Sequence, residues 1–263
     1  MNGGLLTALA DLVLPRTCAG CGTPGAVLCP RCAALLARPR VAAPRRFPWD
    51  FPPTVAAGAY SGPVRPAVIA FKERGRAELA RPLGTALALA VAAVTAAVPA
   101  PRAPVLLVPV PSSPAALRAR GRDHVRELTA RAVAELRAAG VPAAQARLLR
   151  RRGRVRDSAG LTAAQRRANL AGTFLRSGAV PPGALLVVVD DVVTSGATVT
   201  EAAATLAADR ARGDAPVLAA VVAATPRTVR NATSPGDLRV VPRRSENVPE
   251  RPLDRLSGRF RRD

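Results

Sequence analysis

An apolar run, Ala184–Val189, leads directly into two adjacent acidic residues and then into a turn rich in hydroxyl groups. Short apolar runs of this kind are typical of buried strands in a parallel sheet. The stretch that follows, Ala197–Arg212, has helical spacing, so the sequence predicts a strand, a tight turn and a helix. Open parallel sheets bind ligands at the carboxyl ends of their strands. We therefore expect a ligand site at this turn.

The turn offers two kinds of contact to a ligand. Backbone N–H groups and hydroxyls can converge on a phosphate at the N-terminus of the helix, where Gly196 permits close approach of the main chain. Asp190 and Asp191 repel a phosphate, so they suit a pair of sugar hydroxyls or a metal-bound sugar. A phosphorylated ribose satisfies both, whereas the alternative is an ordinary turn with two exposed acids. The turn hydroxyls belong to Thr194, Ser195 and Thr198.

The rest of the chain alternates between expected strands and expected helices. This alternation predicts an α/β fold, with a mostly parallel sheet flanked by helices. Aromatic residues make up only 3% of the chain, so the core should consist of Val, Leu and Ala. We expect strands at Val55–Ser61, Val105–Val110 and Val217–Ala223, and helices at Val64–Arg74, Glu78–Ala97, Asp123–Ala139 and Thr162–Ala168.

All four cysteines fall within fifteen residues, as two Cys-x-x-Cys pairs separated by seven residues. Each pair places two thiolates on a tight turn, so the four sulfurs can converge on one Zn²⁺. A closed four-thiolate site leaves no position for water, so we expect a structural Zn²⁺ without catalysis. The alternative is a set of free or redox-active thiols. The expected ligands are Cys18, Cys21, Cys29 and Cys32.

These features divide the 263 residues into four parts. We expect a zinc-knuckle segment at 1–37, a Pro/Arg-rich linker at 38–53, a main domain at 54–225 and a disordered basic tail at 226–263. The net charge of +21 favours anionic ligands without identifying one. Six arginines crowd into 147–156, which is either a lid over the site or a solvated basic loop.

Two apolar stretches invite comparison with membrane segments. The first, Met1–Leu14, has no preceding basic residue and is interrupted by Asp11, so it does not predict a signal peptide. The second, Leu83–Pro101, is rich in alanine, which contributes little to membrane insertion, and it predicts a buried core helix. We expect a soluble, cytoplasmic protein with no membrane insertion.

The segment 187–198 resembles the signature of type I phosphoribosyltransferases, in which an apolar strand, two acids and two apolar residues precede a Thr/Ser-Gly loop. The resemblance implies that fold, and binding of 5-phosphoribosyl-1-pyrophosphate (PRPP) with Mg²⁺. Asp190 and Asp191 would be the catalytic pair and would hold the ribose 2′- and 3′-hydroxyls. The loop would enclose the 5′-phosphate, so the implied PRPP-binding residues are Asp190, Asp191, Val192, Val193, Thr194, Ser195, Gly196, Ala197 and Thr198.

Further motifs are similar to those of the ComF family of competence-associated phosphoribosyltransferases. They are Phe71–Arg76, Val108–Ser112, Arg118–Gly121 and Leu161–Leu170, together with the N-terminal cysteines. The similarity extends from Cys18 to Thr225, nearly the whole part of the chain that we expect to be ordered. It implies a role in bacterial DNA uptake, with single-stranded DNA or competence-machinery proteins as partners.

In that family, the Pro-Val-Pro turn lies where pyrophosphate would bind. Hydroxyls and free N–H groups of such a turn are suitable donors, although a purely structural turn explains the prolines equally well. Lys72 is the only lysine, which indicates either a need for a compact ammonium or chance. The implied pyrophosphate region consists of Pro111, Ser112, Ser113, Arg118, Arg120 and Lys72.

Two stretches depart from the family pattern. Arg-Gly-Phe-Asn-Gln is replaced by Arg120–His124, and the usual Gln-rich segment before Gly-Leu is replaced by Asp157–Ala159. Both lie where a flexible loop and a nucleobase hood are expected, so the sequence leaves open which nucleophile would accept the phosphoribosyl group. We interpret His124, the only histidine, as a solvated residue at a helix N-terminus rather than as a general base.

As an enzyme, the protein would displace pyrophosphate from ribose C1 with a nitrogen or other nucleophile, a pentosyl transfer through an oxocarbenium-like transition state. This chemistry needs Mg²⁺ for the leaving group and no covalent nucleophile. One alternative is a non-catalytic protein on the same fold that senses PRPP or handles single-stranded DNA. The basic surface favours this alternative, and the scarcity of aromatic residues counts against it. The other alternative is a nucleobase-salvage or amidotransferase-type enzyme, although Cys18 belongs to a knuckle rather than to an N-terminal nucleophile.

Overall fold

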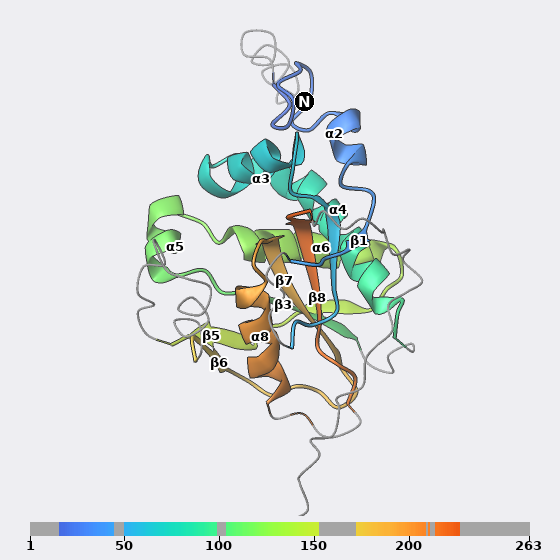
Figure 1. Ribbon diagram of the computed structural model, residues 1–263, viewed down its shortest axis with the longest axis vertical. Helices are drawn as coiled ribbons and strands as arrows, with labels where there is room; N and C mark the ends of the chain where they lie inside the picture. The colour runs from blue at the N-terminus through green and yellow to red at the C-terminus, as the bar shows by residue number, and fades with distance from the viewer. Residues whose placement is uncertain are drawn as a thin grey trace, which may run out of the picture.

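A six-stranded sheet, in the order β1-β2-β8-β7-β3-β4, forms the centre of the computed structural model (Figure 1). The structure describes residues 16–44, 50–98, 104–152, 172–208, 210 and 214–226. Five strands run parallel, and β1 pairs antiparallel with β2 at one edge. The predicted α/β class with a mostly parallel sheet is therefore confirmed. The strands are β1 (Arg40–Val41), β2 (Thr54–Ala59), β3 (Val105–Pro109), β4 (Ala143–Gln145), β7 (Leu185–Val193) and β8 (Leu218–Ala224).

Helices cover both faces of this sheet. In Figure 1, α8 (Ala197–Ala207) lies in front of the sheet, and α4 (Ala80–Thr95) and α6 (His124–Ala138) lie behind it. A two-stranded antiparallel sheet, β5 (Leu149–Arg151) with β6 (Phe174–Arg176), packs beside α8. The remaining helices are α2 (Pro30–Ala34), α3 (Val64–Glu73), the 3-10 turn η1 (Ala77–Leu79) and α5 (Pro114–Arg120).

Two hydrophobic clusters fill the space between the layers. Because side chains alternate along a strand, Val187 and Val189 of β7 face one cluster and Val188 faces the other. The first cluster includes Phe71 and the apolar sides of α3, α4 and α6. The second includes Phe174 and the apolar side of α8. As expected from the composition, Val, Leu and Ala supply most of both.

Within the described residues, the span Ala77–Thr95 is long and apolar enough to cross a membrane, judged by length and composition alone. Half of it is buried in the structure. Leu83, Leu87 and Val91 are almost fully buried in the first cluster, and α4 packs against α6, β2 and β8. The Ala-rich stretch is thus a core helix here, and it ends at Thr95.

Several expected boundaries need correction. Strand β7 does not end at Val189 but continues through both acids to Val193, because β8 pairs with it as far as Val193↔Ala224. The expected linker 38–53 contains the edge strand β1 and the buried Ala42. The expected helix Thr162–Ala168 and nearly all of the expected tail lie outside the described residues.

Candidate functional site

A cavity of about 480 Å³ lies at the carboxyl edge of the parallel sheet. Its walls come from the ends of β2, β3 and β7 and from the helices that follow them, as expected for an open α/β sheet. The lining combines apolar side chains with charged and hydroxyl-bearing ones. The lining residues are Tyr60, Val68, Ile69, Lys72, Glu73, Val110, Pro111, Ser112, Ser113, Ala116, Arg120, His124, Val125, Arg151, Asp190, Asp191, Val192, Thr194 and Thr198.

Most residues that the sequence singled out therefore meet at one cavity. The two acids, Thr194 and Thr198 of the loop, Lys72 and the Pro-Ser-Ser turn all line it. Arg120 lines it too, whereas Arg118 does not. The other loop residues expected to bind the ligand but absent from the lining are Val193, Ser195, Gly196 and Ala197.

Asp191 is enclosed by protein groups. Only 2% of its surface is exposed. Its Oδ2 atom lies 2.8 Å from Lys72 Nζ and 3.3 Å from His124 Nε2, and its Oδ1 atom accepts a 2.8 Å hydrogen bond from the Val192 N–H. Burial alone would raise the pKa of Asp191, but the His124 hydrogen bond and the Lys72 ammonium outweigh burial and lower it.

Asp190 has a different environment. It is half-buried, and its Oδ1 atom accepts a 2.8 Å hydrogen bond from the Asp191 N–H. Among the described residues, no side chain donates to its Oδ2 atom. Burial and the neighbouring Asp191 charge raise the pKa of Asp190 well above its usual range. The two adjacent acids are thus chemically unequal.

The expectation that His124 is solvated is wrong, because His124 is only 2% exposed. Asp123 caps α6 by accepting from the Arg126 N–H at 3.3 Å, so the helix begins at His124 and turns this side chain inward. Its ring packs edge-on against Phe71, with 6.2 Å between the ring centroids. Since a carboxylate only accepts hydrogen bonds, Nε2 carries the proton shared with Asp191.

Lys72 is delivered to the cavity by the last turn of α3. Burial opposes its charge, but Asp191 outweighs this effect and raises the pKa of Lys72. Its neighbour Glu73 is held by Arg120 through two hydrogen bonds of 2.8 and 3.0 Å. Lys72 and Glu73 thus have separate charged partners.

Arg151 reaches the cavity from β5, within the arginine-rich stretch 147–156. Its Nε atom donates to the Pro111 carbonyl oxygen at 3.0 Å, and its guanidinium lies 5.4 Å from the centroid of the Phe174 ring. Burial lowers the pKa of Arg151, while the Asp190 carboxylate acts in the opposite direction. Part of the expected loop is therefore a strand that places one guanidinium in the site.

The loop after β7 is held from outside the cavity. Gly196 caps α8 with a φ of 82°, a left-handed conformation that favours glycine. A side-chain carbon at this position would lie 2.7 Å from Phe51 Cε2 and 3.0 Å from Pro44 Cγ. The segment expected to be a linker therefore packs on the loop expected to enclose a phosphate.

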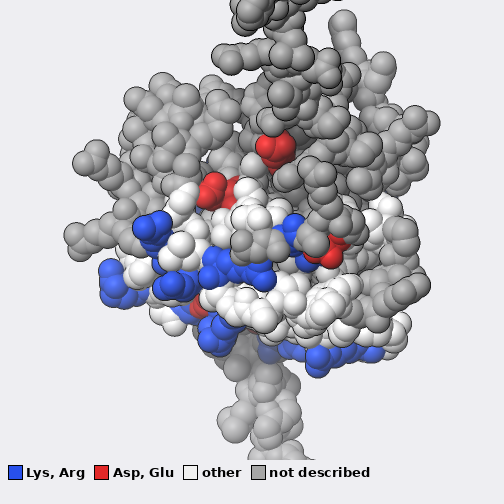
Figure 2. All heavy atoms as spheres, turned by 90° about the horizontal axis from the view of Figure 1, so that it is seen from below, with Lys and Arg blue, Asp and Glu red and all other residues white. Residues whose placement is uncertain are grey.

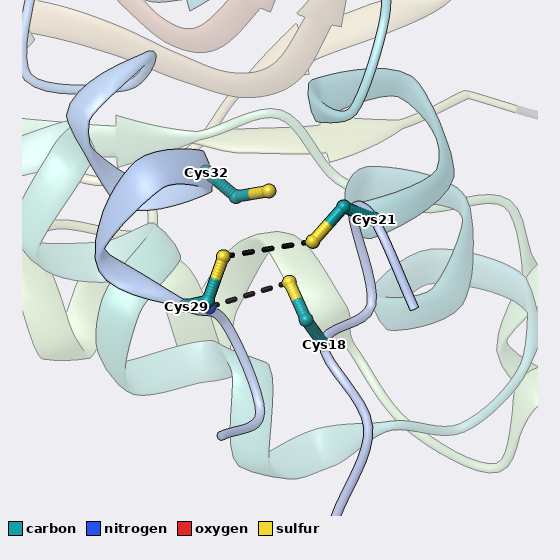
Figure 3. Close-up of side chains that lie close together, drawn as sticks. All are labelled: Cys18, Cys21, Cys29 and Cys32. Atoms are coloured by element: carbon teal, nitrogen blue, oxygen red, sulfur yellow. Dashed lines mark hydrogen bonds between the residues drawn. The ribbon is translucent and has the colours of Figure 1, made fainter. Parts of the chain in front are cut away.

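A second candidate site is the cysteine cluster (Figure 3), in which Cys29 and Cys32 flank the start of α2 and face Cys18 and Cys21. The four sulfur atoms lie within 4.8 Å of one another, and Cys21 Sγ is 3.6 Å from Cys29 Sγ. Four thiolates about 2.3 Å from a tetrahedral Zn²⁺ stand about 3.8 Å apart, so the donor set fits this ion. The structure thus brings together four cysteines able to bind a structural metal such as zinc.

The cysteine cluster rests on the main domain. A side-chain carbon at Gly20 would lie 2.8 Å from the Pro63 carbonyl oxygen and 2.9 Å from Cys32 Sγ, so only glycine fits this contact. Arg76 donates to the Thr17 carbonyl oxygen at 2.9 Å. Burial opposes ionisation of Cys18, but N–H donors led by that of Cys29 lower its pKa to about 6. A thiolate is therefore accessible at neutral pH in this cluster.

No family model and no curated protein matches this chain. Sequence reasoning missed the roles of His124, Glu73 and Arg151, whose partners come from other elements. For His124, the one available signal was that it is the only histidine in the sequence.

Proposed function

We propose that the protein binds PRPP with Mg²⁺ and is a phosphoribosyltransferase of the type I fold. The observation that carries the proposal is the shared cavity: the acid pair and the hydroxyls of Thr194 and Thr198 line the same hollow at the sheet edge. A ligand with a phosphate at one end and a diol nearby satisfies both groups. The similarity to ComF motifs supports the same ligand and a role in DNA uptake in the cytoplasm.

Two groups of residues would bind the two ends of PRPP. The N-terminus of α8 and the loop hydroxyls would bind the 5′-phosphate, since helix N-termini favour anions. The Pro111–Ser113 turn, with Arg120 and Arg151, would face the pyrophosphate. Ser113 already uses its Oγ atom to accept from the Ala116 N–H at 3.1 Å, so its hydroxyl proton is the group left to donate.

Mg²⁺ would neutralise charge on the pyrophosphate leaving group. This ion is usually held through substrate phosphates, a few protein oxygens and several waters, so the site needs no preformed cage. The residues of the protein would hold the ribose in place while the bond from C1 to the pyrophosphate oxygen breaks and the acceptor forms a bond to C1. Asp190, half-buried beside the cavity, would accept hydrogen bonds from the ribose hydroxyls and so hold the ring in place.

Calorimetric titration with PRPP, with and without Mg²⁺, tests the proposal. We expect binding that requires Mg²⁺ and is reduced at least about tenfold by Asp190→Asn. Glu78→Gln, which alters an exposed acid that does not line the cavity, is the control and should bind normally. Release of pyrophosphate with a panel of nucleobases then tests turnover. Absence of PRPP binding by the folded wild-type protein overturns the proposal.

We further propose that the four cysteines hold a structural Zn²⁺. The closeness of the four sulfurs supports this proposal. So does the 3.3 Å hydrogen bond that the Cys29 N–H donates to Cys18 Sγ, because a thiolate is a good acceptor. The ion would stabilise a short segment that contributes few side chains to the core.

A non-catalytic role in handling single-stranded DNA is the second candidate, favoured by the charge distribution. Figure 2 shows basic side chains gathered in a broad band across one face. Arg147, Arg150 and Arg152, in or beside β5, are exposed. Filter binding over a salt series separates the candidates, because binding through phosphates weakens steeply with salt. A steep slope combined with no pyrophosphate release favours the DNA-binding role.

A further inference from the structure

The only lysine and the only histidine of the chain contact the same oxygen atom, Oδ2 of Asp191. The three residues come from α3, α6 and β7, so their meeting is a product of the tertiary fold. The side chains of His124 and Asp191 are each 3% exposed, whereas Lys72 is 32% exposed and reaches the cavity. All three residues line the cavity, but only Lys72 has a side chain that is substantially exposed there.

Asp191 has little capacity left for a ligand. One oxygen is shared by Lys72 and His124, and the other accepts from the Val192 N–H. Asp190, by contrast, keeps one oxygen to which no described side chain donates. Sugar hydroxyls would therefore find an acceptor on Asp190 and a saturated carboxylate on Asp191.

His124 is also placed to act indirectly. Its Nδ1 atom is buried and has no hydrogen-bond partner among the described residues. An atom that water cannot reach cannot take a proton from a substrate in this conformation, so the geometry does not favour a general base. The contact that His124 does make is with Asp191, through Nε2.

Lys72 is oriented by its own contact with Asp191. Glu73, the adjacent acid on α3, is engaged by Arg120, so Asp191 is the carboxylate that pairs with Lys72. An ammonium has three N–H donors, of which Asp191 takes one. The remaining donors are available to anionic groups in the cavity.

We propose that Asp191 is an internal counter-ion and His124 a positioning residue, which together fix Lys72 as a donor to the ligand's phosphate groups and leave Asp190 as the one acid that binds the sugar hydroxyls. The inference rests on the proposed function, and it changes the roles that the sequence resemblance implied for the two acids. His124 contributes by holding the carboxylate that holds Lys72.

A double-mutant cycle on PRPP affinity tests the role of Asp191. We expect Lys72→Met and Asp191→Asn each to weaken binding about tenfold, and the double variant to be no weaker than either single variant. This non-additivity follows if Asp191 acts only through Lys72. Equal and additive losses mean that Asp191 contacts the ligand itself and overturn the proposal.

A pair of His124 variants tests the positioning role. His124→Gln retains an N–H donor for Asp191, whereas His124→Met removes it while keeping an unbranched side chain of similar length. We expect the Gln variant to bind PRPP within about twofold of wild type and the Met variant to bind about tenfold more weakly. Equal affinity of the two variants, with both folded by circular dichroism, overturns the proposal.

Nuclear magnetic resonance provides a readout that does not depend on PRPP. Because the chain has one histidine and one lysine, each selective label gives one side-chain signal. We expect a slowly exchanging Nε2–H signal that is lost in Asp191→Asn but kept in Asp190→Asn. Loss in neither variant overturns the triad, whereas failure of wild-type protein to bind PRPP overturns the proposed function and leaves the triad standing.

Discussion

Phe51 lies against Gly196, and a single added carbon at position 196 would come within 2.7 Å of the Phe51 ring. This contact joins a segment that precedes β2 to the loop that precedes α8. Position 196 therefore requires glycine for two reasons, its left-handed φ of 82° and the ring beside it. The two requirements can be separated by experiment.

We expect Gly196→Ala to lower the free energy of unfolding by about 3 kcal/mol, the sum of backbone strain and overpacking. Gly183→Ala is the matched control, because Gly183 has a φ of 72° and nothing within 4 Å of an added carbon. It should lose only the backbone part, about 1 kcal/mol. Urea unfolding measures both, and equal losses would mean that the Phe51 contact is absent in solution.

We expect Lys72→Met to lower the free energy of unfolding by about 3 kcal/mol at neutral pH, because it leaves the buried Asp191 without its ammonium partner. Glu78→Gln, which breaks the exposed Arg76–Glu78 pair, should cost under about 1 kcal/mol. Urea unfolding again provides the measurement. A loss for Lys72→Met no larger than that of the control would contradict the buried pairing.

The same pair predicts a pH dependence of stability. The folded pKa of Asp191 is lowered, so its contribution is complete above the unfolded value of about 3.9 and is lost as pH falls through the folded value. The folded pKa of Lys72 is raised, so its contribution is complete below about 10.4 and is lost as pH rises through the folded value. The stability difference between wild type and Lys72→Met should therefore be largest between these limits.

We expect purified protein to contain one Zn²⁺ per chain, and a strong chelator to lower its thermal midpoint. Cys32→Ser should lose the metal, whereas Thr23→Ala should retain it, because Thr23 only touches Cys21 Sγ at 3.1 Å. Atomic emission and thermal unfolding are the measurements. Full stability after complete removal of metal would favour free thiols instead.

We expect Arg151→Met to weaken PRPP binding about tenfold, because this half-buried guanidinium lines the cavity and donates to the Pro111 turn. Arg150→Met removes an equal charge from an exposed neighbour that does not line the cavity. It should bind PRPP normally. Similar losses in both variants would indicate a general effect of net charge rather than a specific contact.

The sequence predicted the elements whose signals are local. The apolar runs of β3, β7 and β8 and the helical spacing of α3 and α6 are readable within a few residues, and so is the cysteine spacing. The contact of Asp191 with Lys72 and His124 is not readable in this way, because three distant segments create it. Strands β5 and β6 have three residues each and are rich in arginine, so no apolar alternation marked them.

Strand β7 is longer than its sequence predicts, for a related reason. Two adjacent acids suggest the end of a strand, yet partner residues on β8 extend the ladder past them. The acids therefore sit on a paired backbone rather than on a free loop. The two acids differ because different side chains surround them, and these side chains come from segments distant in the sequence.

Strand β1 has a consequence for how copies of this protein meet. It is only two residues long, it runs against the direction of β2, and both of its residues are exposed. An outer strand so short offers another molecule almost no backbone to extend, and the charge of Arg40 further discourages approach. This border of the sheet is thereby protected from the edge-to-edge stacking that leads to aggregation.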